Sequence, residues 1–225
     1  MPGAVATSII VFGRGLDADA DGAGFRLSRQ STARVDALTR YVGEHTQAFG
    51  ARRGRIVFSG GWAAAADGAT RPPRQYREGQ LMLRHALAAD IAGAGLSRYA
   101  DAYPEIESDS TLENVLRVHE AGYFDGSSFT ARNPLGLVAH AEHLARIGYL
   151  VRKVFGLPGD AIVGIAAPGA DARSGGLPEG LLLLVTRLAL SGARGHDALR
   201  RRHRVLVAGN HRLRSLGSLP RRHGG

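Results

Sequence analysis

Three side chains of the sequence are well suited to moving protons, and each lies beside a segment of helical pattern. Glu78 begins one such segment, Glu107 lies just before another, and His143 follows a short apolar run. Carboxylates and imidazoles are common general acids and bases. The chain has no Cys and no Gly-x-Ser-x-Gly motif, so it offers no familiar covalent nucleophile. The residue types therefore favour acid/base chemistry.

Two glycine-rich turns follow apolar runs and suit a phosphate or another anion. Gly13-Arg14-Gly15 follows the first run, and Ser59-Gly60-Gly61 ends the second. Glycine lets backbone amides approach a ligand closely. The first turn lacks the third glycine of a dinucleotide fingerprint, and no helix begins directly after it, so it does not predict a nicotinamide cofactor. The alternative is a plain strand-end turn that needs Gly for a positive φ angle.

A third polar group begins a helical segment directly after an apolar run. It contains His140, Glu142, His143 and Arg146. Two His three residues apart share a helical face and can bind a metal if a third ligand joins them. The simplest alternative is a solvated first turn. We favour a further option, in which His143 and Arg146 donate to an anion near the helix N-terminus.

The acidic turn that includes Asp17, Asp19 and Asp21 copies the first half of a calcium loop. A true EF-hand loop requires a bidentate Glu at its twelfth position, where Ser28 stands, and a helix before the loop. The run before this loop has the pattern of a strand. We therefore expect a solvated acidic turn, and we expect no metal in the protein.

The elements that must position these residues alternate along the chain. Short apolar runs predict strands at residues 7–12, 55–59, 135–139 and 161–165, with a further strand near 100–106. Stretches of helical period predict helices at residues 31–49, 77–94, 111–121 and 141–155. Ser110 and Glu113 form a capping box at the start of the third helix. This alternation indicates an α/β fold, a three-layer α/β/α Rossmann-like domain with a mainly parallel sheet of about five strands. Ligands of such sheets bind at the carboxyl ends of the strands.

The net charge of +9 is concentrated at the C-terminal end. Residues 194–225 carry nine Arg and one acid, whereas residues 1–193 carry 20 basic and 19 acidic side chains. We therefore predict a domain over residues 1–192 and a basic, Arg-rich, flexible tail over residues 193–225. Nucleic-acid binding through the tail is an alternative function, which we disfavour because the tail has no aromatic residue for stacking.

Membrane segments and export signals have no support in the sequence. The first twelve residues lack the basic start of a secretory signal. The most apolar later stretch, residues 180–190, is about half of the ~20 residues that a membrane helix needs. We expect a soluble, cytoplasmic protein without membrane contact.

Taken in order, these motifs resemble a bacterial family, the YdcF/SanA/ElyC-like domain. The match covers about residues 8–165. The matching residues are Ile9 to Gly15, Arg34, Ser59 to Gly61, Glu78 with Met82, Glu107 with Ser110, Thr111, Glu113 and Asn114, and His143 with Arg146. The chain departs from the family at Ala139 and His140, where Thr and often Ser are usual, so an imidazole stands in place of a hydroxyl contact.

The resemblance implies a five-stranded parallel sheet with a cleft at the strand ends, lined by the matched polar residues. Members of the family have been linked to S-adenosylmethionine binding and to envelope polysaccharide or lipid-carrier metabolism. We expect a bacterial biosynthetic enzyme that acts on a phosphorylated, nucleotide-like or adenosyl small molecule, with S-adenosylmethionine as the candidate cofactor. The alternative is a non-catalytic module that binds S-adenosylmethionine or a nucleotide.

The expected site follows from the motifs and the resemblance together. The predicted catalytic residues are Glu78, Glu107 and His143. The predicted ligand-binding residues are Gly13, Arg14, Gly15, Arg34, Ser59, Gly60, Gly61, Ser110, Thr111, Glu113, Asn114, His140 and Arg146.

Overall fold

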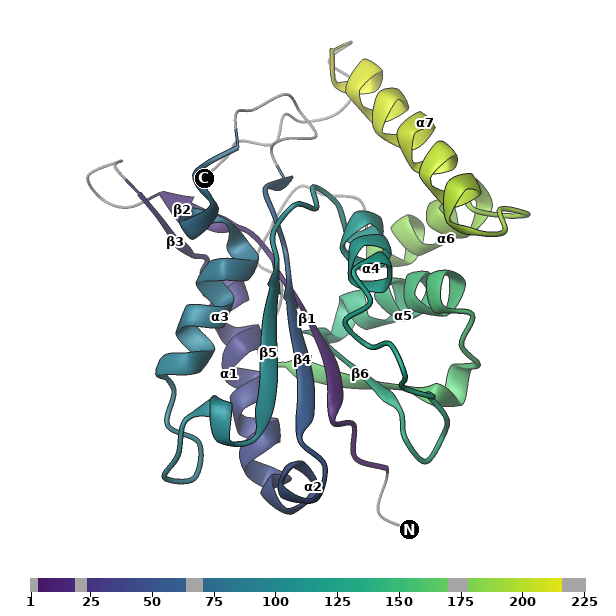
Figure 1. Cartoon of the computed structure of the whole chain (residues 1–225). Coiled ribbons are helices and arrows are strands. Elements are labelled where there is room, and N and C mark those ends of the chain that lie inside the picture. The colour runs from purple at the N-terminus through teal and green to yellow at the C-terminus, as the bar shows by residue number, and fades with distance from the viewer. Residues whose placement is uncertain (1–3, 19–23, 64–70, 170–177, 216–225) are drawn as a thin grey trace.

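A parallel sheet of five strands forms the centre of the protein (Figure 1). The computed structural model describes residues 4–18, 24–63, 71–169 and 178–215, with side chains described to residue 205 in the last helix. The strands are β1 (Ser8–Phe12), β4 (Gly54–Ser59), β5 (Ala100–Glu105), β6 (Leu135–His140) and β7 (Ile162–Ala167). They lie in the order β5-β4-β1-β6-β7, and every neighbouring pair is parallel.

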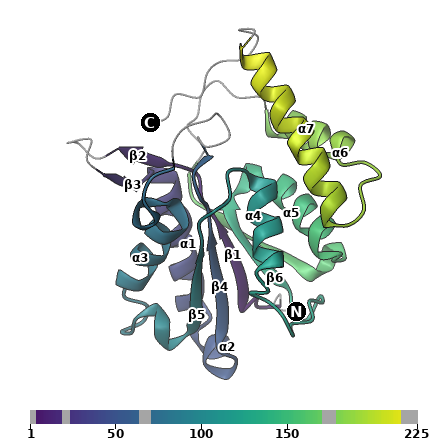
Figure 2. The same cartoon turned by 45° about the horizontal axis from the view of Figure 1, so that its top comes forward.

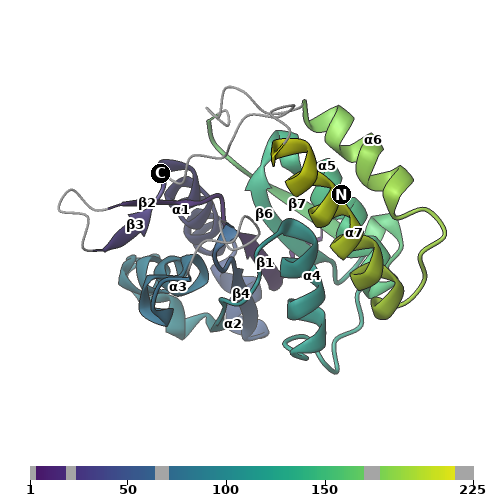
Figure 3. The ribbon, with the colours of Figure 1, turned by 90° about the horizontal axis from the view of Figure 1, so that it is seen from above.

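Helices cover both faces of this sheet, as the view from above shows (Figure 3). α1 (Arg29–Glu44) and α3 (Glu78–Ala88) pack on one face, and α4 (Thr111–Glu120) and α5 (Ala141–Phe155) pack on the other. The side chains of β1 alternate between the two apolar clusters that result. Ile9 and Val11 join the α1/α3 cluster, and Ile10 and Phe12 join the α4/α5 cluster. A strand buried on both faces explains the continuous apolar run of the sequence.

The remaining elements lie outside the three layers. A short antiparallel hairpin, β2 (Leu16–Ala18) and β3 (Phe25–Leu27), follows β1. The other helices are α2 (Thr46–Ala51), α6 (Glu179–Ala189), α7 (His196–Ser215) and the single-turn 3₁₀ segments η2 (Arg74–Tyr76), η3 (Leu96–Arg98) and η4 (Gly159–Ala161).

α7 forms part of the predicted basic tail and packs on the domain through its first half (Figure 2). Leu199 is 1% exposed and belongs to the α4/α5 cluster. Arg200 forms an ion pair with Glu120 at the end of α4. The segment predicted as a flexible tail from residue 193 therefore contains a helix, His196–Ser215, that contacts the domain at Leu199 and Arg200.

The predicted fold class is confirmed, with local differences in two helices. The helix predicted over residues 31–49 is divided at His45 into α1 and α2. The helix predicted over residues 77–94 ends at Ala88, because Ala89 is extended and Ala92 has a φ of +50°. Among the described residues, no helix combines the length and the apolar character needed to cross a membrane.

The strand order reverses between β1 and β6, which makes the carboxyl ends of these two strands the usual ligand-binding edge of such a sheet. The carboxyl ends of β4 and β5 are packed closely: Gly79, in the first turn of α3, lies against the backbone oxygens of Phe58 and Glu105. A Cβ atom at Gly79 would overlap the Glu105 oxygen and come within 2.7 Å of the Phe58 oxygen. The first turn of α3 therefore needs a glycine to approach β4 and β5.

We predict that Gly79→Ala lowers the free energy of unfolding by about 1–3 kcal/mol, because backbone must move to admit the methyl group. The matched control is Gly148→Ala in α5, where the nearest atom, Arg152 Nη1, is 3.7 Å from the new Cβ. That control should be stabilising by about 0.5–1 kcal/mol, because Ala favours a helix over Gly. Urea unfolding measures both values, and equal effects would contradict the packing described.

Candidate functional site

The carboxylate of Glu78 joins the turn after β1 to the turn after β4. Its Oε1 accepts hydrogen bonds from the Gly15 N–H at 2.5 Å and from the Ser31 hydroxyl at 2.6 Å. A Cβ atom at Gly13 would overlap this carboxylate, and one at Gly60 would come within 2.7 Å of Oε2. These glycines make room for a carboxylate of the chain itself, and the Gly15 amide binds it.

The other predicted turn residues also contact neighbouring loops. The Arg14 N–H donates to Ser31 Oγ at 2.8 Å. A Cβ atom at Gly61 would overlap the backbone between Ile106 and Ser108, so the turn after β4 lies directly against the loop after β5. The two turns are thus held by internal contacts at the strand ends.

Arg34 of α1 is buried between the ends of β1 and β6, with 2% of its surface exposed. Its Nη1 donates to the carbonyl oxygens of Phe12 and Gly13, each at 2.9 Å. Its Nε donates to Nδ1 of His140 at 3.0 Å. One guanidinium therefore connects the two strands at the point where the strand order reverses.

His143 and Arg146, in the first turns of α5, both contact Glu179 at the start of α6. His143 Nδ1 lies 2.7 Å from Glu179 Oε1, and Arg146 Nε lies 2.8 Å from Oε2. Partial burial by itself would raise the pKa of Glu179, but the contacts with His143 and Arg146 outweigh it and lower the pKa to about 2. The residues predicted to hold an external anion thus hold an internal carboxylate.

The two buried histidines of this edge face groups of opposite charge. His140 is 1% exposed and His143 is 3% exposed, and their ring centroids lie 6.4 Å apart. Because Arg34 donates to Nδ1 of His140, the neutral His140 ring has its proton on Nε2. Nδ1 of His143 lies against the Glu179 carboxylate.

Glu105, at the end of β5, is a buried acid whose two carboxylate oxygens both accept hydrogen bonds. It is 5% exposed. Its Oε2 accepts from the hydroxyls of Ser59 at 2.8 Å and Ser108 at 2.7 Å, and its Oε1 accepts from two backbone amides, of Glu107 and Ser108. Asn114 Nδ2 lies 3.4 Å from the Ser59 carbonyl. These contacts tie β4, β5 and α4 together.

Glu107, predicted to be catalytic, lies outside this group. Its side chain is 38% exposed and is surrounded by arginines. Arg77 lies 2.5 Å from its carboxylate, Arg71 lies 3.2 Å away and Arg74 lies 3.8 Å away. The acid that ends the strand is Glu105, two residues earlier in the sequence.

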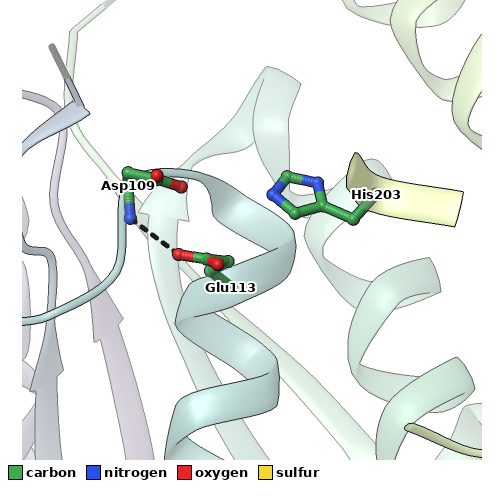
Figure 4. A group of neighbouring side chains, drawn as sticks. All are labelled: Asp109, Glu113 and His203. Carbon is green, nitrogen blue, oxygen red and sulfur yellow. Dashed lines mark hydrogen bonds between the residues drawn. The ribbon is translucent and has the colours of Figure 1, made fainter. Parts of the chain in front are cut away.

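A separate polar cluster surrounds the N-terminus of α4 (Figure 4). Ser110 Oγ accepts from the Glu113 N–H at 3.2 Å, which confirms the predicted cap, and Thr111 is the first helical residue. The Asp109 N–H donates to Glu113 Oε2 at 3.2 Å. His203 of α7 lies beside them, with its Nε2 3.0 Å from Ser110 Oγ.

The structure therefore places most of the predicted site residues in three groups, and Glu107 lies apart among arginines. Arg34, His140, His143 and Arg146 lie at the ends of β1 and β6, next to Glu78 and the glycine turns after β1 and β4. Ser59 and Asn114 belong to the Glu105 group, and Ser110, Thr111 and Glu113 belong to the α4 cluster. Sequence reasoning missed three residues that complete these groups: Glu105, Glu179 and His203.

Two other features lie apart from these groups. Asp17 of the acidic turn is in β2, whereas Asp19 and Asp21 lie outside the described residues. A depression of about 410 Å³ is formed by the second half of α1 and the segment after α3, including Asp36 and Ile91. None of the predicted site residues lines it.

Comparison with known proteins identifies no relative: no family model, no curated protein and no solved structure matches this chain. A functional conclusion therefore depends on the geometry of the described residues.

Glu105 and Glu107 form a matched pair for testing which acid matters to the fold. We predict that Glu105→Gln lowers the free energy of unfolding by about 1–3 kcal/mol, because an amide group then faces hydrogen-bond donors in a buried place. Glu107→Gln should cost less than about 1 kcal/mol, because its ion pairs are partly exposed. Chemical unfolding of both variants measures the difference, and a larger loss for Glu107→Gln would contradict the assignment.

The Asp109–Glu113 pair predicts a dependence of stability on pH. Burial, together with the neighbouring Glu113 carboxylate, raises the pKa of Asp109 from its ordinary value of 3.8 to about 6. Because the pKa of Asp109 is raised in the folded protein, protonation of this side chain stabilises the fold below pH 4, and this contribution is lost as the pH rises through 6. Asp109→Asn keeps the side chain neutral, so it should gain about 1 kcal/mol over the wild type at pH 7.5, an amount reduced by solvent screening. The gain should vanish at pH 4, and a pH-independent difference in melting temperature would contradict it.

Proposed function

We propose that this chain is an enzyme that acts on an anionic small molecule by acid/base chemistry at the carboxyl ends of β1 and β6. The observation that carries the proposal is a pair of buried histidines at these strand ends, with ring centroids 6.4 Å apart and Nδ1 atoms that face the Arg34 guanidinium and the Glu179 carboxylate. Nε2 of His140 would donate a hydrogen bond that stabilises negative charge developing on the substrate. Nε2 of His143 would take up the substrate proton as a general base.

The neighbouring groups support these two roles. The Glu179 carboxylate, ionised at neutral pH, would stabilise the imidazolium that forms when His143 takes up a proton. Arg34 would keep His140 neutral and correctly oriented. The N-terminus of α5 would supply positive potential for an anionic ligand, whereas the charge of Arg146 is paired with Glu179. The chemistry would need no covalent nucleophile.

The proposed ligand class is phosphorylated, nucleotide-like or adenosyl, with S-adenosylmethionine among the candidates. It is supported by the ordered resemblance to the YdcF/SanA/ElyC-like family and by the strand order, which reverses beside the two histidines. A cytoplasmic, biosynthetic role is part of the same proposal.

The Arg-rich tail gives less support to nucleic-acid binding. Two of its described arginines are engaged within the chain: Arg200 pairs with Glu120, and Arg202 Nη1 donates to the carbonyl of Ala189 at 3.1 Å. Arginines that are already paired within the protein are less available to the phosphates of a nucleic acid. The small-molecule site is therefore the better supported of the two.

The experiment combines ligand binding with product analysis. The wild type, His143→Gln and His140→Gln would be tested by thermal shift with S-adenosylmethionine, nucleotides and sugar phosphates. Each ligand that raises the melting temperature would then be incubated with the protein and analysed by mass spectrometry. We expect turnover by the wild type and a loss of about 10²–10⁴-fold in either variant, because His143→Gln removes the base and His140→Gln removes a donor to developing negative charge. His85→Gln, at an exposed histidine that pairs with Asp36, is the control and should keep full turnover.

The outcomes separate the enzyme from a binding module. A ligand that stabilises the wild type but stays chemically unchanged would contradict catalysis and favour the non-catalytic module. Equal turnover in the wild type and His143→Gln would contradict the assigned roles. If no ligand of the panel stabilises the wild type, the proposed ligand class is wrong.

A further inference from the structure

Asp109, Glu113 and His203 bring two carboxylates and an imidazole to one place, outside the proposed acid/base site. One potential ligand atom from each lies within 4.8 Å of the other two. Asp109 and Glu113 belong to the start of α4, while His203 comes from α7 (Figure 4). Three donors from two elements distant in the sequence meet here.

The start of α4 holds the two carboxylates in a defined arrangement. Ser110 caps the helix by accepting from the Glu113 N–H, and the Asp109 N–H donates to Glu113 Oε2. Asp109 Oδ1 is shielded from solvent and accepts no hydrogen bond from the described residues. A buried carboxylate oxygen without a donor is costly, and a cation would satisfy it.

The three side chains offer atoms that bind transition metals. Asp109 and Glu113 supply carboxylate oxygens, and His203 supplies an imidazole nitrogen. Metals bind the deprotonated forms of these groups, so protons compete with a metal at such a site.

We propose that Asp109, Glu113 and His203 form a binding site for a divalent transition metal, with Zn²⁺ as the best match. Zn²⁺ accepts both carboxylate oxygen and imidazole nitrogen, with water as the fourth ligand. Ca²⁺ and Mg²⁺ prefer ligand sets made of oxygen alone, so His203 selects against them. This site departs from the expectation, drawn from the sequence, that the protein binds no metal.

The geometry requires only local adjustment. Ligand atoms around a tetrahedral Zn²⁺ are about 3.3 Å apart, so side-chain rotations of roughly 1–2 Å would close the present spacing. Arg117 Nε lies 3.7 Å from Glu113 Oε2 and competes for the same carboxylate. Arg71 also acts on Asp109, so the arginines reduce the affinity without removing any ligand.

The metal would join α7 to α4. Without metal, α7 is attached here by the contact between His203 and Ser110 and by the Arg200–Glu120 pair. A metal shared by Asp109, Glu113 and His203 would add bonds between the same two helices. Binding should therefore stabilise the folded protein and hold the C-terminal helix against the domain.

The test uses the full chain after removal of metals with a chelator. Zn²⁺ would be titrated at pH 7.5 and pH 5.5 by calorimetry, into the wild type, Asp109→Asn, His203→Asn and the control His85→Asn. We expect one Zn²⁺ per chain in the wild type and the control, with affinity at least about tenfold weaker in both cluster variants. The affinity should also fall at pH 5.5, because protons compete with the metal for its carboxylate and imidazole ligands. Co²⁺ should give visible absorption bands of a tetrahedral site that His203→Asn abolishes.

A second control separates the metal from the attachment of α7. His196→Asn alters another histidine of α7, whose Nε2 lies 3.3 Å from the Val154 carbonyl, and should leave the Zn²⁺ affinity unchanged. If His203→Asn does not fold, Asp109→Asn still tests the site. Absence of stoichiometric Zn²⁺ binding to the wild type, or equal binding to the wild type and the cluster variants, would overturn the proposal.

Discussion

The guanidinium of Arg34 is a buried positive charge at the point where the strand order reverses, and much of the surrounding structure serves to compensate it. Its hydrogen bonds reach Phe12 and Gly13 at the end of β1 and His140 at the end of β6. Separating these strand ends would break hydrogen bonds to a buried charge, and each such bond contributes about 1.5–3 kcal/mol. The same contacts hold the ring of His140, the residue directly before α5.

Internal carboxylates bind several of the groups that the sequence predicted as donors to a ligand. Glu78 binds the Gly15 amide and the Ser31 hydroxyl, and Glu179 binds His143 and Arg146. An anionic substrate at this edge must therefore compete with a carboxylate of the chain or bind beside it. In the folded protein these acids provide hydrogen-bond partners for donors at the buried strand ends, which avoids the free-energy cost of leaving those donors unpaired.

The sequence predicted the fold well because a strand buried on both faces reads as a continuous apolar run, as residues 8–12 do. It predicted the start of α4 because capping chemistry is local: Ser110 and Glu113 are three residues apart. It did not reveal which acid ends β5, since that depends on the register in which Ser59 lies opposite Glu105. Glu179 and His203 were missed because their partners, His143 and Ser110, are distant in the sequence, and neither residue belongs to a motif.

The central position of β1 has a consequence for the order in which the protein can fold. Ser8 pairs with Arg55 on one side and with Leu135 on the other. β1 is the earliest of the five strands to be synthesised, yet it gains its second neighbour only when β6 is made, much later. Until Leu135 emerges, one edge of β1 is exposed and able to pair with other chains. Such non-local pairing slows folding.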